Sequence, residues 1–208
     1  MGNSMIDLYT WTTPNGRKIS IALEEMGLPY KTHAINIGAD EQFSPDFLKI
    51  SPNNKIPAIV DQETGLSIFE SGAILTYLAE KTGKFLPQEN PERAKVLEWL
   101  AWQVAGFGPM LGQLNYFINR AERPMPEAIK RFMDETIRLF HVLDKQLAGH
   151  EYMAGDYSIA DMATYPWSVM AADTVKATAG ISLDNVDRWH KTMSARPAVQ
   201  AGLAVPKT

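Results

Sequence analysis

The sequence predicts a small α/β domain followed by an all-helical domain. In the first half of the chain, strand-like and helix-like segments alternate, and their expected order is β-α-β-α-β-β-α. The alternation stops at residues 84–91, a polar stretch with two prolines that is typical of a linker between domains. Beyond it only helical patterns occur. We therefore expect one domain over residues 5–84 and a helical domain over residues 91–200.

Each element of the first domain has a local signal. Residues 5–9 alternate apolar and polar side chains, as a strand does, and turn-forming residues follow at 12–16. A helical apolar face then ends at Gly27, a residue that suits the left-handed position after a helix. The other expected elements are a strand at 30–35, a short helix at 45–50, a hairpin of β-prone runs at 58–60 and 66–69, and a helix at 71–80 that Gly83 closes.

Four segments of the second half carry helical patterns. An apolar stripe marks residues 128–147, and Ser158 with Asp161 resembles a capping box at the start of another helix. The other two helices are expected at 92–103 and 183–194. Glycines at 106–112 do not have the spacing or the position of a dinucleotide-binding loop, so they indicate a helix break or a close-packing site.

Composition excludes several classes of function. The chain has 208 residues, 45% of them hydrophobic and 21% charged, as an ordinary globular protein does. Acidic residues outnumber basic ones by 24 to 20, so nucleic acid is not an expected partner. No apolar run approaches the roughly 20 residues that span a bilayer, and the N-terminus lacks the pattern of a leader. We expect no membrane contact and a cytoplasmic location.

The residues available for chemistry narrow the choice further. The sequence has no cysteine, which excludes disulfide scaffolds, thiolate metal sites and any mechanism that uses a thiol of the protein itself. The four histidines never fall at metal-ligand spacing, so no metal is expected. If sulfur chemistry occurs here, the sulfur arrives with a ligand.

Three segments together describe a binding site. The turn at 12–16 directs hydroxyl and amide donors and a helix N-terminus to one place, where a thiolate would be stabilised. Ile56 and Pro57 begin a β run, where the proline can adopt the cis form and Ile56 can pair with an extended ligand. Glu70 and Ser71 start a helix, suited to an amine and a carboxylate respectively. Alone, each segment has a structural explanation: a turn, the start of an edge strand, and an N-cap. Jointly they predict a pocket for a small peptide-like thiol with an amino acid head.

These segments also carry a family resemblance. The Asn-Lys-Ile-Pro-Ala stretch at 54–58, the run Glu-Ser-Gly-Ala-Ile-Leu at 70–75 and Ser-Ile-Ala-Asp at 158–161 are similar to landmarks of the cytosolic glutathione transferases. More narrowly, the segments at 13–16, 50–57, 99–103 and 108–113 resemble the bacterial nu class, the glutathione-dependent disulfide-bond oxidoreductases. The resemblance extends over essentially the whole chain.

The resemblance implies a thioredoxin-like N-terminal domain, a helical C-terminal domain and a homodimer with a glutathione site in each subunit. Carried over by position, Thr13 and Asn15 would flank the glutathione sulfur. Gln42 and Ile56, with Pro57, would bind the middle and the glycyl end of glutathione. Glu70 and Ser71 would bind the γ-glutamyl head, and Arg131 would reach a carboxylate of glutathione across the dimer interface, although by its own pattern Arg131 equally fits a solvated helix face.

Three functions are compatible with these residues. The first is a glutathione-dependent disulfide-bond reductase with weak transferase activity, in which bound glutathione thiolate is the nucleophile. The second is a conventional glutathione transferase acting on hydrophobic electrophiles. The third is a glutathione-binding module without catalysis. Tyr9 and Thr12 stay open as alternative contacts to the sulfur, because many relatives use a tyrosine or serine near this turn.

Overall fold

The computed structural model describes residues 5–207, and these form two compact units. One comprises the described chain up to Gln88 together with the segment that begins at Ser194, and the other comprises Glu89–Met193. The fold class is confirmed, since a four-stranded mixed sheet with helices precedes a helical unit. Contacts thus place the last described residues with the first unit, whereas the predicted ranges 5–84 and 91–200 follow chain order.

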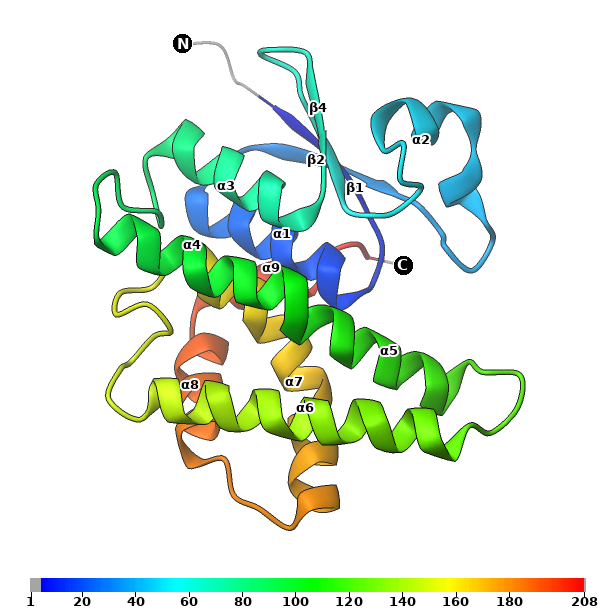
Figure 1. Cartoon of the computed structure of the whole chain (residues 1–208). Helices are drawn as coiled ribbons and strands as arrows, with labels where there is room; N and C mark the ends of the chain where they lie inside the picture. The colour runs from blue at the N-terminus through cyan, green and yellow to red at the C-terminus, as the bar shows by residue number, and fades with distance from the viewer. Residues whose placement is uncertain (1–4, 208) are drawn as a thin grey trace. The chain divides into compact units, whose positions relative to one another are not determined.

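The sheet of the first unit, of which Figure 1 labels β1, β2 and β4, has the strand order β2-β1-β3-β4. β1 (Ile6–Thr10) pairs in parallel with β2 (Tyr30–Ala34) and antiparallel with β3 (Ala58–Asp61). β4 (Leu66–Phe69) closes a hairpin with β3. The alternation of apolar and polar side chains expected at residues 5–9 appears in β1 as alternating burial, with Ile6 and Leu8 fully buried.

Two helices of the first unit pack on each other beside the sheet. They are α1 (Pro14–Met26) and α3 (Ser71–Thr82), and each ends where it was expected, at Gly27 with φ 69° and at Gly83 with φ 66°. The short helices η1 (Glu41–Phe43) and α2 (Pro45–Ile50) lie between β2 and β3 in the sequence. The N-termini of α1 and α3 therefore belong to one layer of packed helices.

A helix that the sequence analysis did not predict closes the first unit. α9 (Pro197–Leu203) packs against α1, and Gly202 lies so close to α1 that an added Cβ would be 2.5 Å from the Ile21 Cα. Ser20 Oγ donates to the Gly202 carbonyl oxygen at 2.6 Å. The seven residues of α9 are too few to show a helical periodicity. Packing against α1 stabilises this helix.

The second unit contains α4 (Glu92–Trp102), α5 (Gly108–Asn119), α6 (Pro126–Leu147), α7 (Ile159–Ala179) and α8 (Asp184–Ser194). The chain does not break at the glycines near 106: a π-helical turn, η2 (Gln103–Phe107), joins α4 to α5. Gly108 is a close-packing site, because an added Cβ would lie 2.7 Å from Gln103 Nε2. Ser158 and Asp161 form the expected capping box of α7.

Candidate functional site

The turn between β1 and α1 is held by its own side chains. Thr13 is the N-cap of α1, and its Oγ1 accepts a hydrogen bond from the Gly16 N–H at 3.1 Å. Because this bond uses an acceptor position of the hydroxyl, the Thr13 O–H proton can still donate. Gly16 has no room for a side chain, since an added Cβ would lie 2.4 Å from Thr10 Oγ1 and from the Trp11 carbonyl oxygen. The turn thus presents a hydroxyl beside a helix N-terminus, where partial positive charge favours an anion.

The start of α3 contributes Glu70 and Ser71. Glu70 follows β4 directly and has φ 71°, a left-handed conformation that residues other than glycine rarely adopt. Such a conformation costs about 1–3 kcal/mol and is concentrated at functional sites. The Glu70 side chain makes no capping bond to α3, and its Oε1 accepts from Asn53 Nδ2 at 3.2 Å. The first N–H groups of α3 can therefore bind the carboxylate of a ligand.

A cavity of about 70 Å³ brings these segments together. Five of the residues proposed for the site from the sequence line it: Asn15, Ile56, Pro57, Glu70 and Ser71. Ser51, Lys55 and Phe69 complete its lining. The Ile56–Pro57 peptide bond is cis, and the Ser51 hydroxyl donates to the Lys55 carbonyl oxygen at 2.8 Å, which holds the loop before Ile56.

The other three proposed residues lie outside this lining. Thr13 is two residues before Asn15 in the same turn. Gln42 lies in η1, where its side-chain amide donates to Asp40 Oδ1 at 3.4 Å and its Oε1 is buried without a hydrogen-bond partner in the described structure. Arg131 is an exposed residue of α6, on a face whose other basic side chains form ion pairs along the same helix.

The alternative sulfur contacts, Tyr9 and Thr12, do not line the cavity either. Tyr9 stacks on His33 with 4.6 Å between the ring centroids and also contacts Phe47. Burial raises the pKa of the Tyr9 phenol, and the nearby Asp7 raises it further. Packing in the sheet accounts for Tyr9, and Thr12 is an exposed turn residue.

Sequence reasoning missed Lys18, which contacts Ser71, as well as the three further lining residues named above. Lys18 on α1 is 2% exposed, and its Nζ donates to Ser71 Oγ at 3.3 Å. Burial lowers the pKa of Lys18 to about 7, and the Glu70 carboxylate partly offsets this effect. Helical spacing contains the signal: Lys18 is one turn before Ala22 and two turns before Met26, both of which are buried, so it lies on the apolar face of α1.

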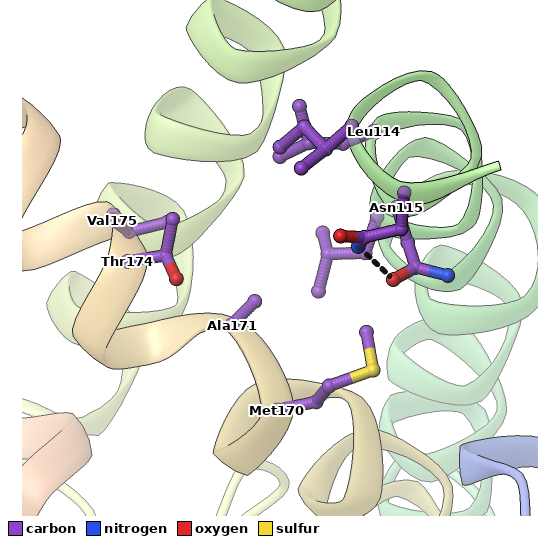
Figure 2. Close-up of a pocket in the computed structure, with 9 residues that line it drawn as sticks. Leu114, Asn115, Met170, Ala171, Thr174 and Val175 are labelled. Atoms are coloured by element: carbon purple, nitrogen blue, oxygen red, sulfur yellow. Dashed lines mark hydrogen bonds between the residues drawn. The ribbon is translucent and has the colours of Figure 1, made fainter. Parts of the chain in front are cut away.

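A larger cavity, of about 210 Å³, lies within the helical unit. Figure 2 shows its two walls, Leu114 and Asn115 from α5 opposite Met170, Ala171, Thr174 and Val175 from α7. Most of the lining side chains are apolar, and the amides of Asn115 and Asn119 are joined by a hydrogen bond of 2.9 Å. The cavity has the mixed lining, mainly apolar with a few polar groups, that binds small organic molecules.

Metal-binding clusters and membrane-spanning helices are both absent from the described part of the chain. No group of three or more histidine, aspartate or glutamate side chains that could hold a metal ion is present among residues 5–207. Within the same part of the chain, no helix combines the length and the apolar character needed to cross a membrane.

The family models identify the chain. The glutathione S-transferase N-terminal domain model matches residues 4–80, and the corresponding C-terminal domain model matches residues 110–197. The chain is 50% identical to the disulfide-bond oxidoreductase YfcG of Escherichia coli K12 over 205 residues, 96% of this chain and 94% of YfcG. The protein belongs to the glutathione S-transferase family.

Solved structures agree with this assignment. A glutathione transferase family member from Pseudomonas fluorescens Pf-5, with two glutathione molecules bound, superposes with a TM-score of 0.91 at 43% identity and covers 98% of this chain and 94% of its own. A glutathione transferase from Pseudomonas putida has the same TM-score and identity, covers 98% of this chain and 92% of its own, and contains one glutathione disulfide per subunit.

Proposed function

We propose that the protein is a glutathione-dependent disulfide-bond reductase that also has weak glutathione transferase activity. One observation carries this proposal: a single cavity joins Asn15, beside the Thr13 N-cap, to Ile56 and to the Glu70–Ser71 helix start. A thiol, a peptide backbone and an amino acid head each find a suitable partner there. The name of YfcG and the glutathione-bound structures support the same assignment.

The proposed roles follow from the chemistry of each group. The Glu70 carboxylate pairs with the α-amino group of glutathione, and Ser71 with the first N–H groups of α3 binds its α-carboxylate. Ile56 pairs with the peptide as a neighbouring strand would, with Pro57 fixing the segment, and Gln42 and Ile56 together bind the middle and the glycyl end. Thr13 and Asn15 donate to the sulfur. A free thiol has a pKa of about 8.5, so these donors and the α1 N-terminus favour its thiolate.

The proposed reaction needs no thiol of the protein, which contains no cysteine. The bound glutathione thiolate attacks one sulfur of the substrate disulfide, the S–S bond breaks, and the released thiolate takes up a proton. A second glutathione thiolate then attacks the mixed disulfide, forms glutathione disulfide and releases the second substrate thiol. Two glutathione molecules are oxidised for each disulfide that is reduced, so the electrons balance.

The proposal extends to assembly and location. We propose a homodimer in which Arg131 reaches a carboxylate of glutathione bound to the other subunit, and sedimentation equilibrium showing only a monomer would remove this role. A cytoplasmic location suits the reaction, because that compartment maintains glutathione in its reduced form.

The function is tested by glutathione-dependent reduction of a small dialkyl disulfide, with aryl-halide conjugation measured on the same preparations. We expect reduction by the wild type and a rate about tenfold to a hundredfold lower in Thr13→Ala, the effect of losing one hydrogen bond to a charged group. Thr13→Ser retains the hydroxyl and the cap, and should keep most of the activity. Thr12→Ala removes an exposed hydroxyl of the same turn and serves as the control.

Two other outcomes would replace the proposal. Negligible disulfide reduction beside robust conjugation would identify a conventional transferase. Inactivity in both assays, with glutathione still bound, would identify a binding module.

A further inference from the structure

We propose that Lys18 is a positioning residue of the glutathione site, which holds Ser71 from behind and makes capture of the ligand carboxylate dependent on pH. This inference rests on the proposed function, because it names the residue that supports the carboxylate-binding end of the same cavity. Lys18 itself does not line the cavity, so it acts through Ser71.

The Ser71 hydroxyl lies between the Lys18 ammonium group and the cavity in which the ligand would bind. Lys18 reaches from α1 to the first residue of α3, and the 3.3 Å between Nζ and Ser71 Oγ spans the contact of these two helices. An ammonium group can only donate, so Ser71 Oγ accepts this bond. The hydroxyl proton of Ser71 is then directed elsewhere, and the side chain of Ser71 lines the cavity.

A neighbouring carboxylate already acts on the charge of Lys18. Glu70 is the carboxylate that acts on it, from the junction of β4 and α3. The ionisable residues of α3, namely Tyr77, Glu80 and Lys81, lie in its second half, away from Ser71. The sequence of α9, which packs on α1 from another side, contains no ionisable side chain. The carboxylate of a ligand at Ser71 would bring a further negative charge close to the ammonium group and favour its protonated form.

This arrangement couples ligand binding to protonation of Lys18. Burial lowers the pKa of Lys18 to about 7 in the unliganded protein, and a bound carboxylate raises it. Below pH 7 the lysine is already protonated, so affinity is highest and nearly constant. Above pH 7 binding requires uptake of a proton, so affinity falls as pH rises, by about tenfold between pH 7 and 8.5 if binding raises the pKa by about two units.

The test is calorimetric titration of the full-length protein with S-methylglutathione, whose blocked sulfur removes the ionisation of the thiol. Titrations at pH 7.5 to 8 in two buffers with different ionisation enthalpies give the number of protons taken up on binding. We expect the wild type to take up most of one proton and its dissociation constant to rise about tenfold from pH 7 to 8.5. Lys18→Met should abolish both effects and weaken binding at pH 7, whereas Lys49→Met removes an exposed lysine of α2 and should preserve both.

The outcomes separate this inference from the proposed function. Proton uptake on binding that is present in the wild type and in Lys49→Met but absent in Lys18→Met supports the role of Lys18. Binding by the wild type without proton uptake would overturn it and leave the glutathione site intact, and this measurement needs no variant to fold. Uptake that persists in Lys18→Met would overturn it as well. Failure of the wild type to bind S-methylglutathione would reject the site altogether.

Discussion

Within the helical unit, His190 is a half-buried base whose ring is neutral above about pH 4. Its Nε2 lies 2.8 Å from Ser168 Oγ, and its ring packs against Tyr165 and Trp189. Burial lowers the pKa of His190 to about 4, and the nearby Asp187 acts in the opposite direction. Neither cavity is lined by His190. We therefore expect its titration to affect stability.

The depressed pKa of His190 predicts a loss of stability in acid. Between about pH 6.5 and 4 the unfolded chain binds a proton at this histidine and the folded chain does not, so the free energy of unfolding falls as pH falls. The loss reaches about 3 kcal/mol at pH 4. Urea unfolding of wild type and His190→Gln at pH 7 and pH 4 measures it, and the stability difference between them should shift in favour of the variant at pH 4. Other titrating groups, including the buried Asp161, are common to both proteins. An unchanged difference would contradict the shifted pKa.

Residue types and their spacing are informative about the site where a local signal exists. Asn15, Ile56 and the Glu70–Ser71 pair were each suggested by turn, strand or capping chemistry, and the structure places them around one cavity. Lys18 was missed because an isolated lysine in a helix is usually exposed, although its spacing from Ala22 and Met26 puts it on the apolar face of α1. The positive φ of Glu70 leaves no mark in the sequence.

At the scale of the element, α9 shows how packing creates a helix that sequence periodicity does not announce. Gly202 allows the backbones of α9 and α1 to approach, and the Ser20 hydroxyl joins them. Arg196, just before α9, forms a bidentate salt bridge with Glu25 of α1. The helix is therefore attached to the same α1 that carries Thr13, Asn15 and Lys18.

Gly202→Ala should loosen this attachment. The new methyl group would meet the Ile21 backbone at 2.5 to 2.6 Å, and backbone atoms cannot move away as a flexible side chain can. We expect a loss of about 1–3 kcal/mol in the free energy of unfolding, measured by urea denaturation. Gly149→Ala is the matched control, since an added Cβ there meets no atom within 4 Å, and its effect should stay within about 0.5 kcal/mol. Equal stability of the two variants would show that α9 does not pack closely on α1.

Elements with explicit end signals were the ones that the sequence predicted well. Gly27, Gly83 and the Ser158–Asp161 capping box each lie at the end that was expected. The structure around the glycines at 106–112 was harder to predict, because a helix break and a close-packing site can have the same glycine-rich sequence. The structure shows a continuous path through a π turn, with Gly108 packed against Gln103.

At the scale of the whole molecule, the absence of cysteine and the arrangement of the first unit together determine how sulfur chemistry can occur. A sheet with α1 and α3 beside it brings two helix N-termini to one cavity. Because the protein has no thiol, all sulfur chemistry at this cavity depends on stabilising the thiolate of a ligand. The overall division into two units follows from the patterning of the chain, whereas the return of the last residues to the first unit is a long-range contact that no local pattern encodes.

The ionisation of bound glutathione tests this account most directly. The ultraviolet absorbance of the thiolate is followed from pH 5 to 9 at saturating protein, with the S-methylglutathione complex as the blank. We expect a midpoint at least about one pH unit below the value of about 8.5 for a free thiol, and a return toward that value in Thr13→Ala. A midpoint equal to that of free glutathione in the wild type would contradict it.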